Sequence, residues 1–157
     1  INLINKNLNI KILMIGKGVN FSNIKFNSLI PKQYQQNFIL LGEIENTQDY
    51  MEAMDIFCLS SLWGEGFPNV LGEAMLVELP CISTNIGDSA EVVGECGLIV
   101  DQPITEEKIT NNLEQLVSLP KVELKQIGKK GRERIISNFT ITKTLDQYQM
   151  IYKEVLE

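Results

Sequence analysis

Two glutamates, Glu65 and Glu73, could carry chemistry, because they flank a glycine-containing turn and the start of a predicted helix with seven residues between them. The turn follows an apolar segment typical of a buried strand, and Pro68 stands near the expected first position of the helix. Glu65 lies in the turn itself. Glu73 lies one helical turn beyond Asn69 on the same face, so we expect its side chain to point toward a ligand rather than into a sheet.

The start of this helix is a predicted anion site. The first backbone N–H groups of a helix have no partner inside it, and the positive end of the helix dipole lies behind them. We expect the N–H groups of Asn69, Val70 and Leu71 to be unpaired. Such a row of donors suits a diphosphate.

Five short apolar segments predict the elements that position this motif. Each is almost continuously apolar, as in parallel strands covered on both faces, and segments with helical spacing separate them. This alternation predicts an α/β fold with a Rossmann-like, doubly wound parallel sheet of about five strands, which binds ligands at the carboxyl ends of its strands. The expected strands span residues 9–15, 37–41, 55–60, 80–84 and 97–100.

Beyond the last strand the pattern predicts only helices, which form a C-terminal helical cap. Thr105 is the expected N-cap of the first of them, and Pro120 follows its end. The second is expected over 122–137, with an interruption or kink near Gly128 or Gly131 because glycine weakens a helix interior. The third is expected over 142–156.

Composition excludes several classes of function. The net charge of -6 argues against nucleic acid as a partner, since phosphate binding needs a basic face. No histidine is present, which removes the commonest metal ligand and general base, and we expect no metal site and no cofactor. The odd number of cysteines, Cys58, Cys81 and Cys96, favours reduced, buried thiols in a cytosolic protein. No apolar run approaches the ~20 residues of a membrane span.

Two further motifs have ordinary interpretations. The segment Gly16-Lys17-Gly18 lacks the third glycine of a dinucleotide-binding loop, so a plain turn is expected. The basic stretch over residues 121–134 leaves two interpretations open, a solvated helix face or contact with the anionic inner surface of a membrane.

The spacing of Glu65 and Glu73 resembles the E-x7-E motif of glycosyltransferase family 4, which has the GT-B fold. The resemblance covers nearly the whole chain in the correct order, as the C-terminal, nucleotide-sugar-binding domain of that family. It includes Asp55-Ile56-Phe57-Cys58-Leu59-Ser60-Ser61, then Glu78-Leu79-Pro80-Cys81-Ile82-Ser83-Thr84 with its following glycine loop, and the two earlier strands that end at Gly16 and Gly42.

The resemblance implies a retaining glycosyltransferase that moves a hexose from a nucleotide-activated donor to a saccharide or lipid-linked acceptor, in cell-surface polysaccharide biosynthesis. Glu65 would contact the transferred sugar as the catalytic residue, and Glu73 would bind the ribose hydroxyls. Backbone amides of Gly66, Phe67 and the helix start would hold sugar and phosphate. The base would lie against the loop after the second strand, which includes Gly42 and Ile44.

One departure from the family concerns the Arg and Lys that neutralise the donor diphosphate, because neither has a counterpart here. We expect them upstream of Ile1, with the acceptor-binding N-terminal domain. Residues 1–157 would then form a single donor-binding domain, cytoplasmic or at the inner face of the membrane, and inactive alone. Two alternatives stay open: a nucleotide-sugar epimerase of the same fold, and a non-catalytic nucleotide-sugar-binding module.

Overall fold

The computed structural model describes residues 1–6 and 9–156. The chain divides into two compact units, Ile1–Met54 and Asp55–Glu157, and each is described by itself.

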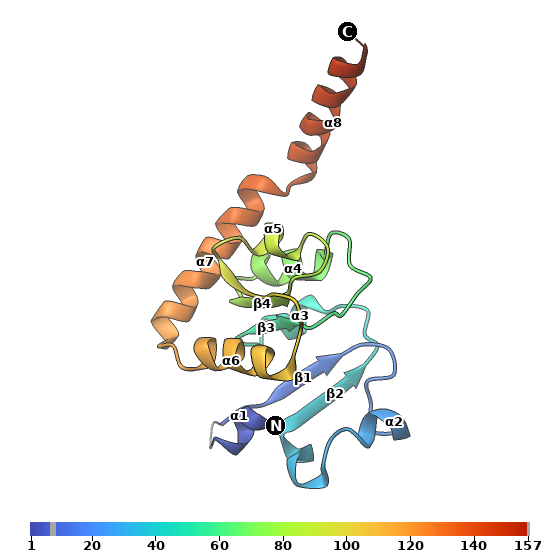
Figure 1. Cartoon of the computed structure of the whole chain (residues 1–157), viewed down its shortest axis with the longest axis vertical. Coiled ribbons are helices and arrows are strands. Elements are labelled where there is room, and N and C mark those ends of the chain that lie inside the picture. Colours follow the sequence, from blue (N-terminus) through green and yellow to red (C-terminus); the bar gives the residue numbers. More distant parts are fainter. Residues whose placement is uncertain (7–8, 157) are drawn as a thin grey trace. The chain divides into compact units, whose positions relative to one another are not determined.

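The described residues of the first unit form two parallel strands and four short helical segments, which Figure 1 shows in blue and cyan. The strands pair from Ile12 opposite Phe38, and the register shifts after Met14, next to the carboxyl ends of the strands. In chain order the elements are α1 (Asn2–Asn5), β1 (Ile12–Ile15), α2 (Ile24–Asn27), the 3-10 helix η1 (Lys32–Asn37), β2 (Phe38–Gly42) and α3 (Gln48–Met51).

The second unit is a three-stranded parallel sheet in the order β3-β4-β5, with helices between and after the strands. The central strand is buried along its whole length, as expected for a strand covered on both faces. The elements are β3 (Phe57–Leu59), α4 (Asn69–Leu76), β4 (Cys81–Thr84), α5 (Ser89–Val93), β5 (Gly97–Val100), α6 (Glu106–Val117), α7 (Lys121–Asn138) and α8 (Ile141–Leu156).

All five expected strands are present, and the prediction of an α/β fold with parallel strands and C-terminal helices is confirmed. One difference concerns their pairing. Among the described residues, β1 pairs only with β2 and β3 pairs only with β4, so the strands form a two-stranded and a three-stranded sheet where one was expected.

The core of the second unit joins the sheet to α6 and α7. Ile82, Val100 and Leu116 form one buried cluster, and the apolar stripe of α6 packs around it. The predicted cap of α6 is confirmed, because the Thr105 hydroxyl accepts a hydrogen bond from the Lys108 N–H at 3.2 Å. This cap fixes where the helix begins.

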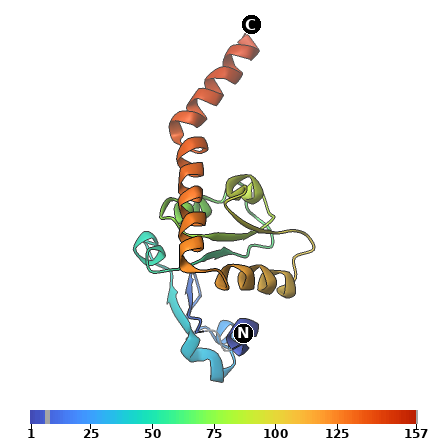
Figure 2. The ribbon, with the colours of Figure 1, turned by 90° about the vertical axis from the view of Figure 1, so that its left-hand side faces the viewer.

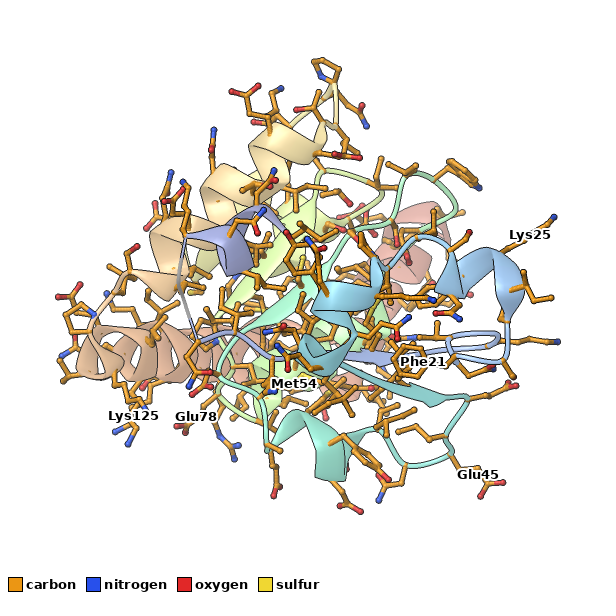
Figure 3. All side chains as sticks on the ribbon, turned by 90° about the horizontal axis from the view of Figure 1, so that it is seen from below. Phe21, Lys25, Glu45, Met54, Glu78 and Lys125 are labelled. Atoms are coloured by element: carbon orange, nitrogen blue, oxygen red, sulfur yellow. The ribbon has the colours of Figure 1, made fainter. Side chains whose placement is uncertain are left out.

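The prediction that Gly128 or Gly131 interrupts the second helix is wrong: α7 is continuous from Lys121 to Asn138. Both glycines are buried, and a Cβ on Gly128 would lie 1.8 Å from the Glu78 carbonyl oxygen. Glycine is therefore needed for the close approach of α7 to the segment that follows α4, and Figure 3 shows Glu78 of that segment beside α7.

The segment that follows α4 is a Schellman turn with an unusual residue in it. The N–H of Glu78 donates to Met75 O at 3.0 Å, and that of Leu79 donates to Ala74 O at 3.1 Å. Glu78 takes the left-handed position of this motif, with φ 63°, where glycine is usual.

Two side chains of the basic stretch have structural partners. Arg132 donates to the carbonyl of Leu76 at the end of α4, and Arg134 donates to those of Glu91 and Val92 in α5. Cationic side chains at helix C-termini stabilise the last carbonyl groups. These arginines therefore hold α7 to two helices of its own unit.

Helix α8 extends away from the sheet of the second unit (Figures 1 and 2), and every residue in it is exposed. Its apolar side chains include a stacked pair, Tyr148 and Tyr152, with ring centroids 6.4 Å apart. The expected amphipathic helix is present, with its apolar side chains uncovered.

The expectation of three buried thiols is confirmed only in part. Cys81 is buried, Cys96 is half-buried and Cys58 is exposed. Cys58 lies on β3, which among the described residues pairs only with β4, whereas the central strand that carries Cys81 pairs on both edges.

Candidate functional site

The turn from β3 to α4 carries the predicted site and lies at the carboxyl end of the sheet, as expected for a doubly wound fold. Pro68 is buried and occupies the N-cap position with φ -77°, directly before the first helical residue, so it stands near the start of α4 as expected. Gly64 has φ 86°, a left-handed backbone that favours glycine, and among the described residues the space where a Cβ of Gly64 or Gly66 would stand is open.

Glu65 is half-buried and has a fixed carboxylate. The Ser61 hydroxyl donates a hydrogen bond of 2.5 Å to Glu65 Oε1. One carboxylate oxygen is thus occupied within the turn, and the other has no hydrogen-bond partner among the described residues. A carboxylate held in this way can present one oxygen to a ligand without reorganising.

The helix start offers two backbone donors rather than the expected three. No hydrogen-bond partner is found in the described part of the chain for the N–H groups of Asn69 and Val70. The prediction for Leu71 is wrong, because its N–H donates to Pro68 O at 2.9 Å. The first turn of α4 closes back on the residue three positions earlier, and this removes the third donor.

Glu73 lies one turn into α4 and is half-buried between residues that pack into the core. Its neighbours Leu71, Gly72, Ala74 and Met75 are all buried. The side chain therefore lies at the border of the packed face of α4, on the side of the exposed Asn69.

Phe67 is exposed to 42% and packs against Phe139, which follows α7, with ring centroids 5.6 Å apart. The Arg134 guanidinium lies 5.7 Å from the centroid of the Phe139 ring. An arrangement of this kind adds a cation–π contact to the aromatic pair. The sequence carried no signal for Phe139, because the contact joins segments about seventy residues apart.

Gly42 and Ile44 belong to the first unit. Gly42 ends β2 with φ 73°, donates to Val19 O at 2.9 Å and accepts from the Gly16 N–H at 2.7 Å. The expected plain turn at Gly16-Lys17-Gly18 is thus tied to the end of β2. Ile44 is half-buried, and Glu45 points outward from this loop (Figure 3).

Neither a metal cluster nor a membrane span is found in the residues described. Across 1–6 and 9–156, no three Cys, Asp or Glu side chains come together as metal ligands would. In the same ranges, no helix has the length and apolar character needed to cross a bilayer.

Curated relatives of this chain are glycosyltransferases and related synthases. The N-acetyl-alpha-D-glucosaminyl L-malate synthase of Bacillus anthracis is 31% identical over 151 residues, which are 93% of this chain and 38% of that protein. The UDP-Gal:alpha-D-GlcNAc-diphosphoundecaprenol alpha-1,3-galactosyltransferase of Escherichia coli is 28% identical over 147 residues, 92% of this chain and 37% of the relative. The chain thus spans about two fifths of the length of these relatives.

Solved structures agree in fold. A glycosyltransferase from Rickettsia africae superposes with a TM-score of 0.77 at 23% identity, over 98% of this chain and 42% of that one. Anabaena HepE, solved with UDP and glucose, gives 0.72 at 17% identity, over 92% and 40%. These likenesses establish the Rossmann-like half of a GT-B fold. The sequence profile described as glycosyl transferases group 1 matches residues 1–118, and the chain belongs to that family.

Proposed function

We propose that this chain is the donor-binding, C-terminal domain of a retaining glycosyltransferase of the family 4 type, and that the turn before α4 binds a nucleotide-activated sugar. The observation that carries the proposal is the fixed Glu65 carboxylate in the turn that leads directly to two free N–H groups, those of Asn69 and Val70. A carboxylate binds sugar hydroxyls, and a helix start binds phosphate.

The chemistry assigned to these groups is positioning and charge stabilisation. Transfer breaks the bond between the anomeric carbon and the diphosphate oxygen and forms a bond from that carbon to the oxygen of an acceptor hydroxyl, whose proton is taken up by the departing diphosphate. Negative charge builds up on the leaving diphosphate, where the Asn69 and Val70 N–H groups would stabilise it. Glu65 would hold the transferred sugar, and Glu73 the ribose. Retention of the anomeric configuration rests on the resemblance to the family.

The relatives support the donor class. The Escherichia coli relative is a galactosyltransferase that uses UDP-Gal and an undecaprenol-linked acceptor, and HepE was also solved with UDP-glucose. A saccharide or lipid-linked acceptor and a role in cell-surface polysaccharide biosynthesis are proposed here by analogy. The base-binding role of Gly42 and Ile44 stays a prediction, as does the need for the protein's own N-terminal domain.

The proposal is tested in the full-length protein with two glutamate variants. Glu73→Gln should weaken binding of the preferred nucleotide sugar by ~1–3 kcal/mol, because a charged hydrogen bond to a hydroxyl carries about that much. Glu65→Gln should lower kcat far more than donor affinity, since its contact is with the reacting sugar. Calorimetry with UDP-glucose, UDP-galactose, UDP-N-acetylglucosamine and GDP-mannose measures binding, and nucleotide release measures turnover.

Glu95→Gln is the matched control, because Glu95 is exposed and its substitution removes the same charge. Unchanged affinity in Glu73→Gln would remove Glu73 from the site. An equal loss of affinity and turnover in Glu65→Gln would make Glu65 a binding residue only, and unchanged turnover would refute its catalytic role. Donor binding without turnover of any donor by the wild type would favour a non-catalytic module. We also propose that transfer needs no divalent metal, an idea overturned if EDTA abolishes it and magnesium or manganese restores it.

A further inference from the structure

The turn that carries Glu65 is held by two residues that do not touch its carboxylate, one at the end of β4 and one in the loop that follows it. The first is Thr84, the last residue of β4, whose side chain is buried. Its hydroxyl donates to Ser61 O at 2.6 Å. Since the Ser61 hydroxyl in turn donates to Glu65, Thr84 fixes the residue that fixes the carboxylate.

The second is Gly87, which contacts the turn from the 85–88 loop. It has φ 56°, and a Cβ there would lie 2.3 Å from Gly66 O and 2.5 Å from Glu65 O. The next residue, Asp88, donates its N–H to Gly66 O at 2.9 Å. The two loops therefore meet backbone to backbone, which only glycine permits at this position.

Of the two loops in contact, the 85–88 loop is held by more hydrogen bonds than the turn that carries Glu65. The Asn85 N–H donates to Val100 O at 2.9 Å, and its side chain donates to Asp101 at 2.6 Å. The Ser89 hydroxyl closes the other end by donating to Ile86 O at 2.7 Å. The Glu65 turn is open around Gly64 and Gly66, so a collision between the loops would displace the turn rather than the 85–88 loop.

We propose that Thr84 and Gly87 are positioning residues for Glu65: Thr84 through Ser61, and Gly87 by letting the 85–88 loop support the turn. This inference rests on the proposed function. A Cβ on Gly87 would push the backbone of Glu65 and Gly66 by about 1 Å before the contact became tolerable. A displacement of that size at a reacting centre costs about 10²-fold in rate.

Four variants of the full-length protein test the proposal. Gly87→Asn keeps a residue that accepts a left-handed backbone but adds the colliding Cβ, so it separates the collision from backbone strain. Gly18→Asn is its matched control, because Gly18 has φ 77° and faces only a side chain, Asn23. Thr84→Val removes the hydroxyl at nearly constant volume, and Thr84→Ser restores it.

We expect Gly87→Asn and Thr84→Val to lower kcat by about 10²-fold while donor KM changes less than about threefold. Hydrogen exchange of the backbone over residues 60–68, followed by mass spectrometry, should be faster in both. Gly18→Asn and Thr84→Ser should match the wild type in rate and exchange. The rate is measured as nucleotide release from whichever of UDP-glucose, UDP-galactose, UDP-N-acetylglucosamine or GDP-mannose is turned over.

The outcomes separate this inference from the proposed function. Wild-type exchange over 60–68 in both Gly87→Asn and Thr84→Val would overturn the positioning role. Faster exchange with unchanged kcat would leave the positioning intact and refute the catalytic role of Glu65. If Gly87→Asn fails to fold, the comparison of Thr84→Val with Thr84→Ser tests the positioning role by itself, because neither substitution adds appreciable volume at the end of β4.

Discussion

Gly128→Ala and Gly131→Ala should change stability in opposite directions although both replace a buried glycine in the middle of α7. A Cβ on Gly128 would lie 1.8 Å from Glu78 O, and contacts below 3.0 Å essentially never occur, so α7 or the end of α4 must move by about 1.2 Å. A Cβ on Gly131 would meet only the Met75 side chain, at 3.4 Å or more.

The magnitudes follow from these two environments. Overpacking costs ~1–3 kcal/mol, and a rigid backbone as the obstacle places Gly128→Ala at about 3 kcal/mol or more. Either alanine returns about 1 kcal/mol of helix propensity. Gly128→Ala should therefore lower the free energy of unfolding by at least ~2 kcal/mol, whereas Gly131→Ala should raise it by ~0.5–1 kcal/mol.

Urea unfolding followed by circular dichroism measures both values, and thermal scans should separate the two variants by roughly 6–12 °C for a chain of this size. The two variants control for each other, because both glycines are buried in α7 and both substitutions add a single methyl group. Equal stability of Gly128→Ala and Gly131→Ala would show that close approach to Glu78 does not explain the glycine.

Three other substitutions test single features. Glu78→Gly should stabilise the chain by about 1 kcal/mol in urea unfolding, because it relieves the left-handed φ of 63°, and a destabilised variant would contradict that. Thr105→Ala should cost ~1 kcal/mol by removing the α6 cap, with the exposed Ser118→Ala as control. Burial, and secondarily the nearby Cys58, raise the pKa of the Cys81 thiol from 9.0 to about 12. The contribution of this protonated thiol to the free energy of unfolding is complete below pH 9 and is lost as the pH rises toward 12. The free energy of unfolding should therefore fall by up to ~1.4 kcal/mol per pH unit above pH 9, and this fall should be smaller in Cys81→Ala.

The sequence was sufficient wherever a local pattern determines the outcome. Every strand was placed within three residues, because each buried strand is a continuous apolar run, and the cap at Thr105 follows from the residue type. The prediction that a glycine interrupts α7 was wrong because it relied on a local property alone. The helix propensity of glycine is local, but its use here is a contact with Glu78, fifty residues away in sequence.

In the candidate site, too, the sequence predicted the features that depend on local residues and missed those that depend on contacts between distant segments. The sequence predicted a carboxylate in the turn and free donors at the helix start, and the structure places Glu65, Asn69 and Val70 accordingly. It missed Thr84 and Phe139, whose partners lie on other elements. The pairing of Leu71 depends on how the first turn of α4 closes, and residue types alone do not specify that geometry.

Helix α8 differs thermodynamically from the other long helices, because no residue in it is buried. Within the residues that the structure describes, its helical state is supported by local contacts, which include the Lys143 N–H donating to the Thr140 hydroxyl at 3.3 Å and the Tyr148–Tyr152 stack. A solitary helix of 16 residues is near the length at which isolated helices are marginal in water. On warming, α8 should therefore melt gradually as a helix–coil equilibrium, while α6 and α7 unfold with the sheet in one cooperative step.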